Sequence, residues 1–81
     1  MAIVDNLPMM KDRRYELLRN LLIEARLKQG LTQTDVAFLI SKPQSYVSKY
    51  ESGERRIDVV EFLDVCKAIE VDFRLILKRI S

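Results

Sequence analysis

Residues 44 to 52 carry polar side chains at a spacing that suits hydrogen bonding to the edges of nucleic acid bases. Drawn as a helix, the segment places four of them on one side: Gln44, Ser45, Ser48 and Lys49. The apolar Val47 and Tyr50 lie on the other side. A glutamine amide offers a donor and an acceptor together, as adenine N7 and N6 require, and a lysine can donate to guanine O6 and N7. A solvated helix face would show the same residues, so the pattern alone leaves both interpretations open.

Residues around this segment could bind phosphate. Gln33 stands at the start of a preceding helix, where free backbone amides and the helix dipole favour an anion. Arg55 and Arg56 follow Gly53 and would meet phosphate across a groove, although ordinary surface charge would look the same. Phosphate contacts are predicted from six residues: Thr32, Gln33, Lys42, Tyr46, Arg55 and Arg56.

The charge of the chain is small in sum but unevenly distributed. Its 81 residues carry a net charge of +2. Residues 11 to 28 and 41 to 56 are locally basic, whereas residues 57 to 73 hold five acidic side chains against one lysine. A molecule with one basic and one acidic side approaches a polyanion in a preferred orientation.

The elements that must position these residues are helices. With only two glycines and two prolines, the apolar spacing is helical throughout, which predicts an all-α chain. We expect the first helix from Asp12 to Gln29, ending at a left-handed Gly30. Thr32 opens a second helix through a capping box with Asp35, and this helix runs to about Ile40.

The third helix, 44 to 52, begins after Ser41-Lys42-Pro43, because proline breaks one helix and suits the first turn of the next. It ends at Gly53. Val47 is its buried anchor, and Tyr50 is expected to pack in or beside the core. One alternative is local: Ser41 to Gln44 could form a capping box that draws the Gln44 amide back to the backbone.

Two more helices follow a polar link. Asp58 is expected to cap the fourth and Asp72 to start the fifth. The fourth should bury Val59, Phe62, Leu63, Cys66 and Ile69, and the fifth Phe73, Ile76, Leu77 and Ile80. Five short helices with short links predict a compact bundle over residues 12–81, preceded by an N-terminal tail at 1–11.

The stretch from Leu31 to Gly53 resembles the Cro/repressor (XRE) family of helix-turn-helix proteins. The resemblance rests on Gly-Leu-Thr-Gln at 30 to 33, Ala37, a helix opening at Gln44 and Glu-Ser-Gly at 51 to 53, and it extends over roughly residues 15 to 77. It implies a lambda-repressor-like DNA-binding domain whose helix 44–52 enters the major groove of a pseudo-palindromic operator.

The resemblance also implies individual roles. Gln33 would touch the DNA backbone and steady Gln44, and Arg26 would pair with Glu51 as part of the scaffold. Two positions depart from the family, which usually has glycine where Ser41 stands and serine or threonine where Pro43 stands. The departure removes a hydroxyl that would contact phosphate.

These observations predict a sequence-specific transcription regulator, a repressor, that binds double-stranded DNA as a homodimer. Its two recognition helices are expected to lie about 34 Å apart, which is one DNA turn. The last helix, with Leu75 and Leu77, is the expected dimer contact. The alternative is an antitoxin-type module that neutralises a toxin partner and regulates its own operon. The chain has no histidine and one cysteine, Cys66, so we expect no metal site, no cofactor and no enzyme activity. No segment suits a secretory signal or a membrane span, so we expect a cytoplasmic protein.

Overall fold

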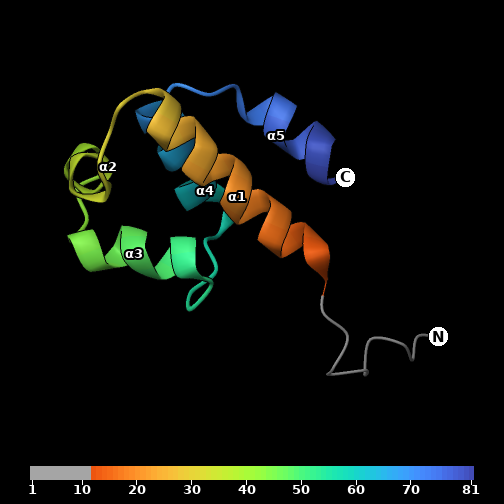
Figure 1. Ribbon diagram of the computed structural model, residues 1–81, viewed down its shortest axis with the longest axis horizontal. Helices are drawn as coiled ribbons and strands as arrows, with labels where there is room; N and C mark the ends of the chain where they lie inside the picture. The colour runs from red at the N-terminus through yellow and green to blue at the C-terminus, as the bar shows by residue number, and fades with distance from the viewer. Residues whose placement is uncertain (1–11) are drawn as a thin grey trace.

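The computed structural model describes residues 12–81, which form five helices and no strand within that range. The helices are α1 (Arg13–Lys28), α2 (Gln33–Leu39), α3 (Gln44–Ser52), α4 (Val59–Ala68) and α5 (Phe73–Ile80). The long α1 contacts both α3 and α5, and α2 contacts α3 and α4 (Figure 1). The prediction of an all-α fold is confirmed. The predicted tail, 1–11, lies outside the described residues.

Four of the five helices begin at a side chain that caps them. Asp12 and Asp72 accept hydrogen bonds from the first turns of α1 and α5. Thr32 and Asp58 form capping boxes, with Asp35 and Glu61 as the returning side chains. These short polar signals satisfy amides that a helix leaves free, so they fix where α2 and α4 begin. α3 differs, because Pro43 precedes it and provides no side-chain cap within the described residues.

The turns around the α2–α3 pair use left-handed backbone. Gly30 and Gly53 have φ values of 73° and 88°, as the ends of α1 and α3 require. Ser41 adopts φ 58° in the turn before α3. The Lys42 amide donates to the Ala37 carbonyl over 2.9 Å and closes this turn. The turn therefore keeps a glycine-like geometry although the chain has serine there.

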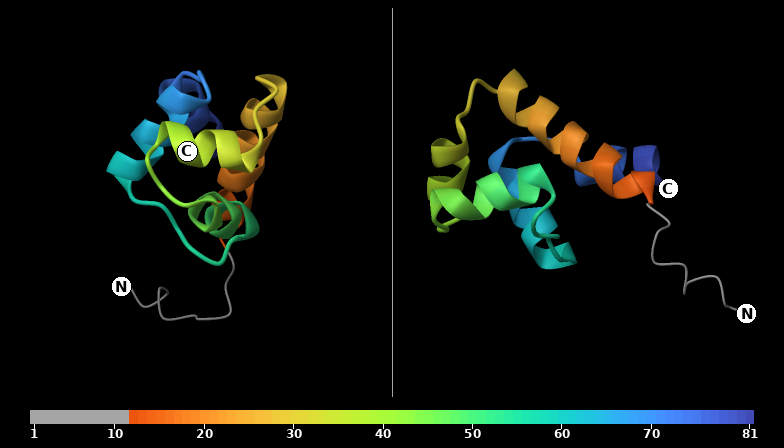
Figure 2. Two further views of the ribbon diagram at one scale, coloured as in Figure 1. Left: turned by 90° about the vertical axis from the view of Figure 1, so that its left-hand side faces the viewer. Right: turned by 60° about the horizontal axis from the view of Figure 1, so that its bottom comes forward.

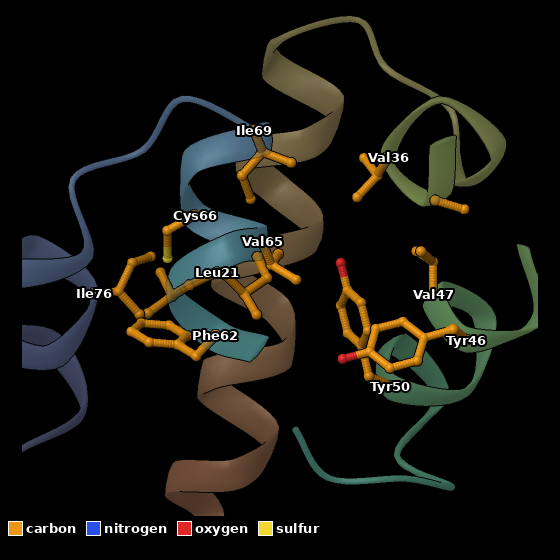
Figure 3. Close-up of a cluster of buried hydrophobic side chains, with 12 residues drawn as sticks. Leu21, Val36, Tyr46, Val47, Tyr50, Phe62, Val65, Cys66, Ile69 and Ile76 are labelled. Atoms are coloured by element: carbon orange, nitrogen blue, oxygen red, sulfur yellow. The ribbon is translucent and has the colours of Figure 1, made fainter. Parts of the chain in front are cut away.

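All five helices supply side chains to one core. Leu22, Val36, Val47, Val65 and Ile69 are almost fully buried. Figure 3 shows Val36 of α2 and Tyr46, Val47 and Tyr50 of α3 at the right of the view, with Phe62 and Cys66 of α4 and Ile76 of α5 at the left, all in one cluster. The buried Ala37 allows α2 and α3 to cross closely, and the views of Figure 2 show α3 lying beside α1 near the loop to α4. The core thereby holds α2 and α3 at a fixed angle.

The predicted buried faces of α4 and α5 were partly wrong. Val59 is 72% exposed and Leu63 41% exposed, whereas Val65, not predicted to be buried, is 1% exposed. Leu63 lies about 100° around the helix from Phe62, at the edge of the stripe that Phe62, Cys66 and Ile69 define, and Val65 lies nearer its centre. In α5 only Ile76 is buried. Phe73 and Leu77 are exposed, and Ile80 packs partly against the core.

Candidate nucleic-acid interface

The first residue of α3 has an exposed side chain. Gln44 is exposed, and its amide nitrogen donates to Gln33 Oε1 over 2.7 Å. Neither Ser41 nor Gln44 makes a side-chain hydrogen bond that caps α3. The capping box considered for Ser41 to Gln44 is therefore wrong. Pro43 is the N-cap, so Ser41 lies two residues before the position that a capping box needs, and Gln44 is the first helical residue instead of the third.

A chain of hydrogen bonds runs inward from Gln44. Gln33 Nε2 donates to Glu51 Oε1 over 2.9 Å. Glu51 also accepts from Arg26, through Nε at 2.7 Å and Nη2 at 3.1 Å. The third arginine donor, Nη1, binds the Leu31 carbonyl over 2.9 Å. The side chains of this ion pair are only 11% and 6% exposed, so the network is anchored inside the domain.

This network sets the direction of both amides. A carboxylate only accepts hydrogen bonds, so Gln33 must turn its NH₂ toward Glu51 and its oxygen outward. That oxygen accepts from Gln44, which leaves one N–H and the oxygen of the Gln44 amide free. A free donor beside a free acceptor is the pair that an adenine edge binds. The sequence did not predict the contact between Gln33 and Glu51, because only the fold brings the start of α2 to the last turn of α3.

Comparison with known proteins agrees with this geometry. Residues 22–76 match the family model described as Helix-turn-helix. A solved structure of an XRE-family like protein from Pseudomonas syringae pv. tomato is 46% identical, with a TM-score of 0.79, covering 83% of this chain and 82% of that one.

The chain belongs to the XRE-type helix-turn-helix family.

Two other solved structures share the fold. The restriction-modification controller protein C.AhdI from Aeromonas hydrophila is 31% identical, with a TM-score of 0.71, covering 82% of this chain and 99% of that one. The wild-type controller protein C.Esp1396I is 20% identical, with a TM-score of 0.77, covering 86% and 92%. A search of curated proteins finds no match. In this helix-turn-helix regulator, α2 and α3 are the two helices of the DNA-binding motif, and α3 is the second.

The other predicted base contacts of the regulator differ in exposure. Ser45 and Lys49 are exposed on α3, and Lys49 makes no ion pair with any residue from 12 to 81. Ser48 is half-buried. The structure therefore leaves Gln44, Ser45 and Lys49 more accessible to a groove than Ser48.

The predicted phosphate contacts around α2 and α3 are partly occupied within the domain. The Thr32 hydroxyl accepts from the Asp35 amide over 3.0 Å, and its proton remains free to donate. Tyr46 is buried, with its ring edge-on to Tyr50 at 5.8 Å between centroids. The Lys42 ammonium lies 5.4 Å from the centre of the Tyr46 ring and is exposed. The prediction that Tyr50 packs in the core is confirmed.

The two arginines after Gly53 have different surroundings. Arg55 binds the Glu61 carboxylate through two nitrogens, at 2.9 and 3.3 Å, and lies over the Tyr46 ring. Hydrogen bonds from Arg55 and from the Asp58 amide lower the pKa of Glu61 to about 2, so this acid stays charged and offsets Arg55. Arg56 lies 3.9 Å above the Tyr15 ring and has no acidic partner within residues 12–81.

Within residues 12–81 no group of three or more acidic, cysteine or histidine side chains could hold a metal ion. Cys66 is buried, and burial raises the pKa of its thiol to about 11, so it is protonated at neutral pH. None of the helices in this range has the length and apolar character to cross a membrane. The family and its fold make the chain a DNA-binding transcription regulator.

Proposed function

We propose that the chain is a sequence-specific repressor that binds a pseudo-palindromic operator as a homodimer and inserts α3, residues 44–52, into the major groove. The observation that carries this proposal is the hydrogen-bonded chain from the part-buried Arg26 to Gln44. It ends in an exposed amide whose free donor and acceptor face outward at the leading end of the motif's second helix. In this motif the first residues of that helix contact base edges.

The division of roles follows from charge and exposure. Gln44, Ser45, Ser48 and Lys49 would contact bases, while Thr32, Gln33, Lys42, Tyr46, Arg55 and Arg56 would contact phosphate. Phosphate contacts set register and affinity, and base contacts set sequence preference. The names of two neighbours, both restriction-modification controller proteins, support a regulatory role. Binding to chromosomal DNA would place the protein in the cytoplasm.

The test of base reading begins with operator selection from a random DNA pool, followed by footprinting. Gln44→Ala should then cost about 1–3 kcal/mol on the preferred site, confined to one base pair per half-site, an A·T pair. Binding to scrambled DNA and the melting temperature should hardly change, because Gln44 caps nothing. Asn20→Ala, an exposed change on α1, is the control. Equal losses on selected and scrambled DNA would contradict base reading by Gln44.

The dimer is supported by the apolar surface that the fold leaves uncovered on α5. Leu75 is 61% exposed and Leu77 44% exposed, and Phe73 is exposed as well. Burying such side chains against a second copy of the chain would stabilise the dimer by roughly 25 cal/mol per Å² of apolar area removed from water. Sedimentation should show a dimer at micromolar concentration, and Leu77→Lys should shift it toward monomer. A wild-type monomer without cooperative DNA binding would contradict the dimer.

Two finer points need a cellular readout. Repression is tested by a reporter placed behind the selected operator, whose output should fall when the protein is present. The antitoxin alternative stays a prediction, and a neighbouring gene that encodes a toxin would favour it.

A further inference from the structure

A small cavity lies beside the last turn of α3, between α1 and the loop that leads to α4. It has a volume of about 120 Å³. Leu22 and Ile57 give it apolar lining, and three arginines border it: Arg19, Arg55 and Arg56. The sequence analysis predicted no individual role for Arg19, which lies within the first helix.

Two of these three arginines carry charge that no ion pair offsets. Arg55 is bound by Glu61, as described above. Arg19 and Arg56 form no ion pair with any residue of the described range, 12–81. The Asp12 carboxylate is held by Arg14, whose hydrogen bonds lower its pKa to about 2, with a smaller contribution from the charge of Arg56. The lining of the cavity therefore holds three arginines and no acidic side chain.

Both of these guanidinium groups are held in position by packing. Arg56 lies over the Tyr15 ring at 3.9 Å. The Cζ atom of Arg19 lies 3.0 Å from where a Cβ atom would stand on Gly53, so the absence of a side chain there makes room for it. The negative end of the α3 dipole favours a cation at this place and opposes an anion, so a phosphate bound here is held by the two guanidinium groups and not by the helix end. Because neither side chain donates a hydrogen bond to a residue in 12–81, their N–H groups remain available.

The volume of the cavity and its arginine lining indicate which kind of ligand it could bind. Water occupies about 30 Å³ in the liquid, so the space equals roughly four waters. This space has room for a single tetrahedral oxyanion. The planar fork of arginine matches the oxygens of a phosphate group and binds them through charge-assisted hydrogen bonds.

We propose that Arg19 and Arg56 form a binding site for one phosphate group beside Gly53. The group can be a phosphodiester of bound DNA or a free phosphate ion, since both present the same oxygens. In the first case the inference rests on the proposed DNA-binding function and adds Arg19 of α1 to the interface. In the second case it stands independently of that function.

The first arm of the test titrates the ¹⁵N-labelled full chain with inorganic phosphate at constant ionic strength, using chloride as the balancing anion. We expect saturable NMR shifts confined to the Gly53 amide and the Nε groups of Arg19 and Arg56. Arg19→Gln and Arg56→Gln should weaken this binding about tenfold. Arg13→Gln, which removes the same charge from an exposed position of α1, should not change it. Arg19→Lys keeps the charge but loses the planar fork of the guanidinium group, so its affinity for phosphate should lie between those of Arg19→Gln and the wild type.

The second arm measures binding to duplex DNA as a function of salt. If a phosphodiester occupies the site, Arg19→Gln should lower the log-log salt slope by about 0.9 relative to Arg13→Gln. If only the free ion binds, the slope stays unchanged and the phosphate titration alone responds to Arg19→Gln. Absence of any DNA binding would overturn the proposed function but not the phosphate titration.

The inference is overturned if Arg19→Gln matches Arg13→Gln in both arms. It is also overturned if Arg19 serves only as a cation that stabilises the end of α3. That structural role predicts a lower melting temperature for Arg19→Gln, with unchanged phosphate shifts and an unchanged salt slope. The melting temperature of each variant is therefore measured beside the two titrations.

Discussion

At its first residue, α3 presents a neutral amide whose direction is set by Gln33 and, behind it, by a buried ion pair. Beyond its last residue the chain turns at Gly53 into Arg55 and Arg56, which lie over aromatic rings. Hydrogen bonds depend on direction, while attraction between charges does not. We infer that one short helix separates the two tasks of DNA recognition, with sequence reading at its start and phosphate binding after its end.

The ends also differ in how firmly they are held. The leading end is tied to the core by Glu51, whose side chain is 6% exposed. The trailing end is held by Arg55 and Glu61, whose side chains are 42% and 17% exposed. Solvent screens the second pair more strongly. Four sets of variants test this contrast between the two ends.

The largest effect is expected from Glu51→Ala. It leaves the part-buried Arg26 guanidinium without its carboxylate and should lower the free energy of unfolding by several kcal/mol, up to the roughly 3–5 kcal/mol lost when a fully buried pair is broken from one side. Chemical denaturation measures this change. The control is Arg14→Ala, which removes the exposed pair with Asp12 and should change stability by less than about 1 kcal/mol. Similar losses in both variants would remove the distinction between the two kinds of pair.

The next effect concerns the link between Gln33 and Gln44. If Gln33 orients Gln44, then Gln33→Ala should relax the preference at the base pair that Gln44 contacts. In a double-mutant cycle on the selected operator, the two changes should be non-additive by about 0.5–3 kcal/mol. Thr34→Ala, the exposed neighbour on α2, should combine additively with Gln44→Ala. Additive losses for Gln33 and Gln44 would show that the two side chains act separately.

A smaller loss of DNA affinity at any single base pair is expected from the arginines that follow α3. Arg55→Ala combined with Arg56→Ala should weaken binding to all sequences about equally and lower the log-log salt slope by about 0.9 for each phosphate that is no longer neutralised. Fluorescence anisotropy at several salt concentrations measures both quantities. An unchanged slope would remove these arginines from the interface, and a changed base preference would contradict the division between the two ends.

The smallest effect is a change of acid stability at Glu61. Its folded pKa of about 2 lies below the ordinary value of 4.5, so the charged carboxylate stabilises the fold above about pH 4.5. That stabilisation is lost as the pH falls toward 2. Because the pair is exposed, the loss should stay below about 1 kcal/mol. Denaturation between pH 5 and pH 2 should show a shallower decline for Glu61→Gln than for the wild type; parallel declines would contradict the pairing.

Local signals in the sequence determined the elements of this protein. Thr32 and Asp58 open helices because their side chains bind amides three residues ahead, and Gly30 and Gly53 end helices because they enter the left-handed region. The spacing of Val47 and Tyr50 identified the buried face of α3. Each of these signals acts within one or two turns of helix, so it can be read without knowing the rest of the fold.

The tertiary structure decided what lies far apart in the chain. Val65 is buried in the core whereas Leu63 is exposed, although both lie beside the apolar stripe of α4. Only contacts with the other helices distinguish the two positions. The tertiary structure joined Gln33 to Glu51, 18 residues away, and thereby gave the Gln44 amide its direction. It also set Arg19 against Gly53. Such contacts depend on the angle at which helices cross, and that angle follows from the packing of the whole core.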